Sequence, residues 1–177
     1  MINKINTLKN QSGVVLVVSL IMLVLLSLIG ITGTQVTGLE EKMANNNRDK
    51  NLAFQAAEAA LRAGEIKIES KTTTEEFAAT TENGLLSKDE SVPDHFNSNT
   101  WTDNDSFSFD ANLDQVNIQP RYFIKYTGDH EVPCINTASY GQPCSVIISY
   151  FTVTSKGTGA QDTSEAYLRL NYGKEFY

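Results

Sequence analysis

The sequence is short of cysteine, histidine and positive charge, and each shortage excludes a class of protein. Two cysteines and two histidines in 177 residues are too few for a multi-cysteine zinc module or a disulfide-dense mini-protein. Lys and Arg total 14 against 21 for Asp and Glu, which gives a formal net charge of −7. Because phosphate binding needs clustered Lys and Arg, we expect no direct binding of nucleic acid.

Charged side chains are missing altogether between Asn10 and Leu39. Within this segment, 15 of the 18 residues from Val14 to Ile31 are apolar. A helix of that length spans about 27 Å, close to the thickness of the bilayer hydrocarbon. The 13 residues before it carry Lys4 and Lys9 and no acid. This pattern predicts a membrane segment with a cytoplasmic N-terminus and the rest of the chain across the membrane.

Three interpretations of the apolar segment compete. A secretory signal peptide has a shorter apolar region and a small-x-small cleavage site, whereas TGTQVTG follows Ile31 here. A plain signal anchor remains possible. The third interpretation is a basic leader, residues 1–13, that a peptidase removes between Gly13 and Val14, so that the apolar segment stays on the mature chain.

Proline is absent from Leu39 to Ser70, and the segment has helical periodicity. Apolar residues recur three and four positions apart at Leu52, Ala56, Ala59, Ala63 and Ile66, with a neighbouring stripe at Phe54, Ala57 and Leu61. We therefore expect one helix from about Val14 to near Ile68, roughly 80 Å long. Its second half should pack a broad apolar face on its own domain.

Residues 13–65 resemble the N-terminal region of PilX-type minor pilins of type IV pili. That family shows Gly before an apolar stretch, then an L-x-E-[KR]-M-A-x-N run, a basic residue with an acid, and A-F-x-A-A-E-A-A-L-R. The matching positions are Leu39, Glu41, Lys42, Met43, Ala44 and Asn46, then Arg48 and Asp49, then Ala53, Phe54, Ala56, Ala57, Glu58, Ala59, Ala60, Leu61 and Arg62.

The resemblance implies a non-enzymatic filament subunit without a cofactor, which primes pilus assembly and supports attachment and twitching motility. The implied partners are other minor pilins, the major pilin, a tip adhesin and the prepilin peptidase. Before assembly the chain would lie in the inner membrane with a periplasmic head, and afterwards in the extracellular pilus. The alternatives are a K-like pseudopilin of type II secretion and a signal-anchored periplasmic enzyme or sensor.

Val18 departs from the usual pilin pattern. If Val14 is the first mature residue, Val18 is the fifth, where most type IV pilins carry Glu. A carboxylate costs about 2.5–3.5 kcal/mol in the centre of a membrane and demands a partner. That partner is thought to be the amino terminus of the subunit ahead. Since K-like pseudopilins also lack the acid and cap their filament, Val18 predicts a position at the tip.

The remaining sequence predicts a head that completes a type IV pilin-like α+β fold. We divide the chain into a leader (1–13), a membrane half (14–35) and an amphipathic half (36–68) of the helix, a polar surface connection (69–119) and an antiparallel sheet (120–177). Partial disorder is the alternative for the connection. The predicted strands are 121–126, 145–155 and 165–172, with a glycine-bearing turn at 156–161.

Cys134 and Cys144 lie between the first two predicted strands. A head outside the cytoplasm predicts a disulfide between them, with free thiols or a redox pair as alternatives. Pilins commonly carry a disulfide in this part of the head. His95 and His130 fall in polar loops, and a metal at His130 would lack a second nearby His or Cys. Asp103, Asp105 and Asp110 resemble a calcium loop only loosely, so we expect polar turns.

Overall fold

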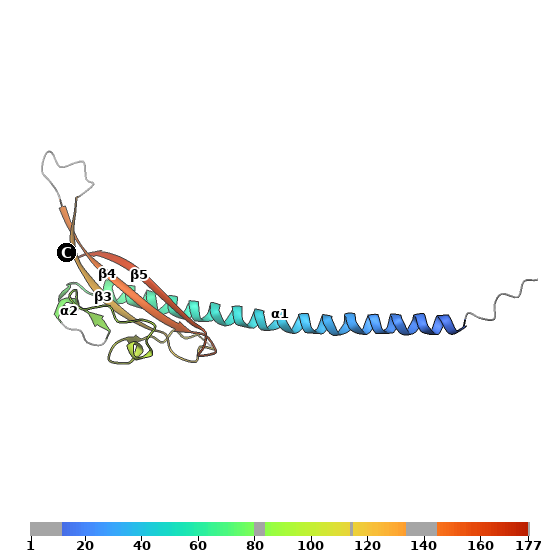
Figure 1. Ribbon diagram of the computed structural model, residues 1–177. Helices are drawn as coiled ribbons and strands as arrows, with labels where there is room; N and C mark the ends of the chain where they lie inside the picture. Colours follow the sequence, from blue (N-terminus) through green and yellow to red (C-terminus); the bar gives the residue numbers. More distant parts are fainter. Residues whose placement is uncertain (1–11, 80–83, 114, 134–144, 177) are drawn as a thin grey trace, which may run out of the picture. The chain divides into compact units, whose positions relative to one another are not determined.

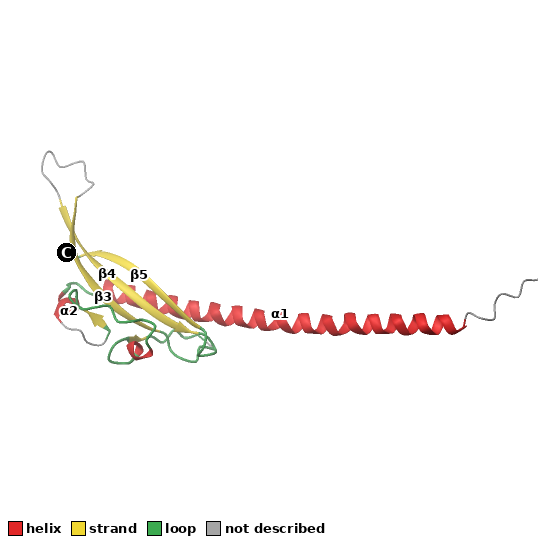
Figure 2. Ribbon diagram, viewed as in Figure 1, coloured by secondary structure: helices red, strands yellow, loops and turns green. Residues whose placement is uncertain are grey.

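The computed structural model describes residues 12–79, 84–113, 115–133 and 145–176. The chain divides into two units, residues 1–46 and 47–177. The helix α1, Ser12–Glu69, is 58 residues long and is drawn as one continuous helix in Figure 2. The continuous helix expected from the absence of proline is thus confirmed.

The head contains a five-stranded sheet built around three long strands (Figure 1). These are β3, Arg121–Pro133, β4, Ser145–Thr158, and β5, Glu165–Glu175. They pair antiparallel in the order β3-β4-β5. The expected antiparallel pairing is therefore present, and all three strands are longer than predicted.

Two short strands outside the predicted sheet region join the sheet, and one of them makes it mixed, while β3, β4 and β5 are antiparallel as predicted. The first, β1, Leu85–Leu86, pairs parallel to β3, and the second, β2, Phe107–Ser108, pairs antiparallel to it. A helix α2, Glu75–Ala79, and a 3-10 turn, Ser98–Trp101, lie in the same connection. Runs of two residues are too short to leave a hydrophobic period in the sequence, so the pattern could not predict them.

Within the head, the last part of α1 packs on one face of the sheet. Buried residues of this core come from the helix, from α2 and from both central strands: Ala60, Ala63, Ile68, Phe77, Tyr122, Ile124, Tyr126, Phe151 and Val153. Strand side chains alternate between the two faces. Phe151 and Val153 therefore share the face of β4 that meets the helix, while Tyr150 and Thr152 point to the opposite face.

The helix and strand β4 approach each other closely because small residues face one another. A Cβ atom on Gly157 would overlap the backbone of Ala53 and Ala57, and one on Gly64 would overlap the Val153 side chain. Such contacts restrict these positions to glycine and the facing helix positions to alanine. Close packing of backbone atoms thus explains why this half of the helix is rich in Ala.

The phase of the predicted apolar stripe was partly wrong. Phe54 and Ile66, placed in the stripes from their hydrophobicity, are 49% and 68% exposed. The fully buried helix positions are the small residues Ala53, Ala56, Ala57 and Ala60. A large side chain cannot enter a contact where glycine meets backbone, so size outweighs hydrophobicity here.

The connection before β3 covers part of the other face of the sheet. Leu86 and Trp101 pack with Phe123 of β3, and Tyr167 of β5 joins them. Trp101 is 8% exposed, and its indole nitrogen donates to the backbone oxygen of His95. Part of this predicted surface connection therefore packs on the sheet, while many of its described residues are exposed.

Candidate functional site

The apolar half of α1 exposes its side chains. The large apolar residues from Val14 to Ile31 are between 48% and 68% exposed. This helix is long and apolar enough to cross a membrane, with a mean hydropathy of 3.2 over its best 18-residue window. An apolar surface of this size on a single chain marks a contact with lipid or with other proteins.

Hydroxyl groups in this segment are bonded within the helix. Ser19, Ser27, Thr32, Thr34 and Thr37 each donate to a backbone carbonyl three or four residues earlier, at 2.7–3.1 Å. A polar group with its own internal partner costs little in an apolar medium. These hydroxyl groups therefore leave the segment compatible with an apolar environment.

Gly13 and Val18 have no packing role that would fix their identities. Within the described part of the chain, a Cβ atom on Gly13 would meet no atom within 4 Å. Val18 is 49% exposed. If glycine is required at position 13, or an uncharged residue at position 18, the reason would be a contact with another molecule.

Residues 12–62 match the family model described as PilX N-terminal. These residues are those of a PilX-type type IV pilin. The match covers the exposed apolar segment and the start of the head. No curated protein and no solved structure is detectably similar to the chain. The sequence resemblance is thereby confirmed over the helix, and the head is described from its own geometry.

The first part of the pilin motif lies on the surface of its helix. Leu39 and Met43 are 60% and 59% exposed. Glu41, Ala44 and Asn46 are exposed as well. Contacts within the head therefore do not account for the identities of these five residues.

The second part of the motif is explained by the fold of the head. Ala53, Ala56, Ala57 and Ala60 are buried. Ala59, Leu61 and Glu58 are half-buried, while Phe54 and Arg62 are exposed. Glu58 pairs with Arg62 at 2.6 Å on the helix surface.

Arg48 and Asp49 join the helix to the head. Arg48 Nη2 donates to Gln115 Oε1 at 2.8 Å. Asp49 Oδ1 accepts from the backbone nitrogens of Ala160 and Gln161, at 2.7 and 3.3 Å, in the turn between β4 and β5. We call these Asp49 hydrogen bonds the hairpin clasp.

The hairpin clasp lowers the pKa of Asp49 below its ordinary value of 3.8. The main cause is a hydrogen bond from the Ser164 side chain; burial, the next largest effect, raises the pKa, and the two backbone bonds lower it further. Gly159 leaves room for the carboxylate, because a Cβ atom there would overlap Asp49. Gly157 and Gly159 thus both lie in close contact with the helix.

The far end of the helix is also anchored. Tyr172 donates its hydroxyl proton to Glu69, and this bond lowers the pKa of Glu69 and raises that of Tyr172. Lys174 Nζ donates to the backbone oxygens of Ile68, Glu69 and Lys71 at 2.8–3.0 Å. A cation at the last carbonyls of a helix is electrostatically favourable.

Polar residues that the sequence singled out for metal binding have other contacts. In the described ranges, no three His, Cys, Asp or Glu residues come together in a way that could hold a metal. Asp103 pairs with Arg121 at 2.5 Å, Asp105 accepts from Thr102, and Asp110 accepts from the Asn112 nitrogen. Cys134 and Cys144 lie outside the described residues.

Both histidines contact aromatic rings, and His130 belongs to strand β3. His95 is 4.2 Å from the Phe96 ring, and His130 is 5.3 Å from the Tyr150 ring. The sequence placed His130 in a loop, whereas β3 continues to Pro133 and includes it. The run of aromatic and apolar residues that predicted this strand ends at Tyr126, and β3 continues beyond it.

Proposed function

We propose that this chain is a minor pilin that primes assembly of a type IV pilus and lies at or near its tip, supporting attachment and twitching motility. The observation that supports this most is the apolar segment 14–31, exposed and free of acidic residues, on a helix of the PilX type. The helix would leave the lipid and pack against equivalent helices in the filament core.

Processing between Gly13 and Val14 would make this transfer possible. The leader carries the two basic residues that precede the apolar segment, so its removal takes positive charge away from the end that enters the filament. Among the described residues, no atom lies close enough to Gly13 to require glycine there. This supports the explanation that the glycine serves recognition by the prepilin peptidase.

The tip position rests on Val18. A shaft subunit has a neighbour ahead whose amino terminus can pair with the usual Glu. A leading subunit has none, and an unpaired carboxylate would cost a few kcal/mol in a dry core, roughly the 2.5–3.5 kcal/mol of membrane insertion scales. K-like pseudopilins share this absence, which makes a pseudopilus tip the second candidate.

Other minor pilins, the major pilin and a tip adhesin are the proposed partners, with the exposed motif residues Leu39 and Met43 among the contacts. We also propose that Cys134 and Cys144 form a disulfide once the head is periplasmic. The described residues that flank them, Pro133 and Ser145, are register partners of β3 and β4, so both cysteines adjoin the same rung of the ladder.

Immunogold labelling of the chain on intact pili tests the proposal. We expect a few labels at one end of the filament, and the same ends labelled with a head-directed antibody after shearing. Gly13→Ala is the matched control, because an uncleaved chain should remain in the membrane and leave pili unlabelled. Regular labelling along the shaft, or a gain of incorporation in Val18→Glu, would contradict a tip role.

A further inference from the structure

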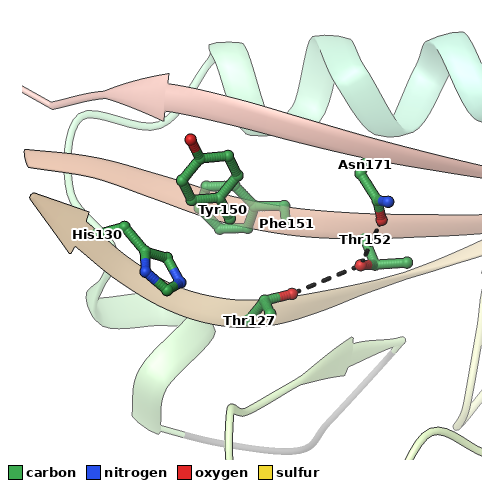
Figure 3. A pocket seen from close by; sticks show the side chains of 6 residues that line it. All are labelled: Thr127, His130, Tyr150, Phe151, Thr152 and Asn171. Carbon is green, nitrogen blue, oxygen red and sulfur yellow. Dashed lines mark hydrogen bonds between the residues drawn. The ribbon is translucent and has the colours of Figure 1, made fainter. Parts of the chain in front are cut away.

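A groove lies on the face of the sheet opposite α1. Its volume is about 550 Å³, and it crosses all three long strands. The residues that line it are Thr127 and His130 of β3, Tyr150, Phe151 and Thr152 of β4, and Asn171 of β5 (Figure 3). The Phe151 ring belongs to the core on the helix side. Phe151 therefore lines the groove with its backbone.

A β-bulge brings Thr127 and His130 to the same face. The register of β3 and β4 shifts by one residue between Tyr126 and Gly128. Without the extra residue, strand alternation would direct Thr127 outward and His130 toward the helix side. Gly128 has a φ of 127°, which favours glycine at the bulge. The bulge therefore determines which side chains form this groove.

The groove combines a row of neutral polar groups with two rings. The hydroxyls of Thr127 and Thr152 are 3.5 Å apart, and Thr152 Oγ1 donates to Asn171 Oδ1 at 3.0 Å, so the row runs across the strands. Beside it, the His130 and Tyr150 rings stand at 75° with centroids 5.3 Å apart. The Tyr150 ring is partly exposed.

The lining chemistry excludes several kinds of ligand. No Lys, Arg, Asp or Glu is among the described residues that line the groove, so none of those four charged side chains is there to complement an anion or a cation. The backbone groups that join β3 to β4 and β4 to β5 beneath the groove are used in the ladders, and the outer edge of β5 lies beside the face that the groove occupies. An extended peptide, which binds mainly through such groups at a sheet edge, would find none on the face.

We propose that this groove binds a neutral glycan, a short run of uncharged pyranose sugars. Hydroxyl and amide side chains can each donate and accept, which matches the hydroxyls of a sugar, and a tyrosine ring offers an apolar surface for its C–H face. The groove volume is within the usual range for small-ligand sites. This site goes beyond the proposed function and does not depend on the position of the chain in a filament.

The test uses the full chain, solubilised in a detergent without a sugar headgroup because maltosides would compete. Neutral hexasaccharides of glucose, galactose and N-acetylglucosamine are offered, and saturation-transfer NMR and calorimetry measure binding. Hyaluronan hexasaccharide serves as the charged counterpart. We expect at least one neutral hexasaccharide to bind in preference to hyaluronan, with saturation transfer to its C–H protons.

Variants locate the binding. Tyr150→Ala should raise the dissociation constant about tenfold or more, the effect of losing a stacked ring and its contact area, and Asn171→Ala should raise it less. Ile147→Ala is the matched control, since Ile147 is on the same strand and 61% exposed but points to the other face. Folding is checked for each variant by Trp101 fluorescence. Absence of neutral-glycan binding, a preference for hyaluronan, or equal losses in Tyr150→Ala and Ile147→Ala would overturn the proposal.

Discussion

The two parts of α1 have the same secondary structure and opposite surroundings. Residues 14–31 carry large apolar side chains that are about half to two-thirds exposed, whereas Ala53, Ala56, Ala57 and Ala60 are fully buried. Hydrophobicity therefore does not indicate which part of this helix packs within the chain. Side-chain size does so where helix and sheet are closest, between Ala53 and Gly64, while the large Ile68 is buried beyond this stretch.

This difference separates two kinds of constraint on one sequence. The alanines, Arg48 and Asp49 are set by contacts inside the head. The apolar segment and the exposed motif residues Leu39 and Met43 are not. Substitutions in the first group should act on stability, and substitutions in the second group should act on association with membrane or partners.

The largest expected contrast is between two isoleucines of the same helix. Ile68→Ala should destabilise the head by about 3 kcal/mol, because Ile68 is fully buried in the core and its loss leaves a cavity. Ile29→Ala, at a position 68% exposed, should leave head stability unchanged. Urea unfolding in detergent, followed by the fluorescence of the single tryptophan Trp101, measures both. Equal losses in the two variants would remove the distinction between the two parts.

A smaller contrast compares two glycines. Gly157→Ala should cost about 1–3 kcal/mol, because its Cβ atom would overlap the backbone of α1 and push helix and strand apart. Gly33→Ala meets no described atom within 4 Å and should, if anything, favour the helix by up to about 1 kcal/mol. The same fluorescence measurement applies. A tolerated Gly157→Ala would show that helix and strand separate at little cost.

The smallest contrast concerns the hairpin clasp and its dependence on pH. The folded-state pKa of Asp49 is below 3.8, so its contribution to stability is complete above that value and is lost as the pH falls through the lower, folded-state pKa. Asp49→Asn should lower the melting temperature slightly at pH 7 and flatten its decline below about pH 4. Glu41→Gln, at an exposed position of the same helix, is the control. An unchanged acid profile in Asp49→Asn would show that the clasp contributes nothing.

Local patterns predicted the long elements well. The helix and the hairpin of β4 and β5 follow from periods of about 3.6 and 2 residues, and the expected common face of Leu168, Leu170 and Tyr172 agrees with their pairing to Ser155, Val153 and Phe151. The stripe at Phe54 and Ile66 failed because the sequence shows hydrophobicity but not the distance between two backbones.

The groove could not be predicted for a related reason. Whether His130 shares a face with Thr127 depends on one extra residue in β3, and a bulge is visible only once the partner strand is in register. The glycine at position 128 was the available signal. Likewise, Asp49 reaches a turn 111 residues away in sequence, a distance over which periodicity carries no information.

The hairpin clasp also determines how the head would carry a mechanical load. From Ala57 to Gly64 the helix advances about 10 Å, and from Gly157 to Val153 strand β4 covers about 13 Å; contacts at both ends of this stretch link the two. Beyond it, Asp49 is bonded to the turn that follows the strand. Helix and strand therefore run side by side over this length. A pull along the helix axis would strain these contacts together, in shear, instead of opening them one after another. Force applied to the apolar segment would reach the head first at Arg48 and Asp49, the first residues of the helix bonded to it.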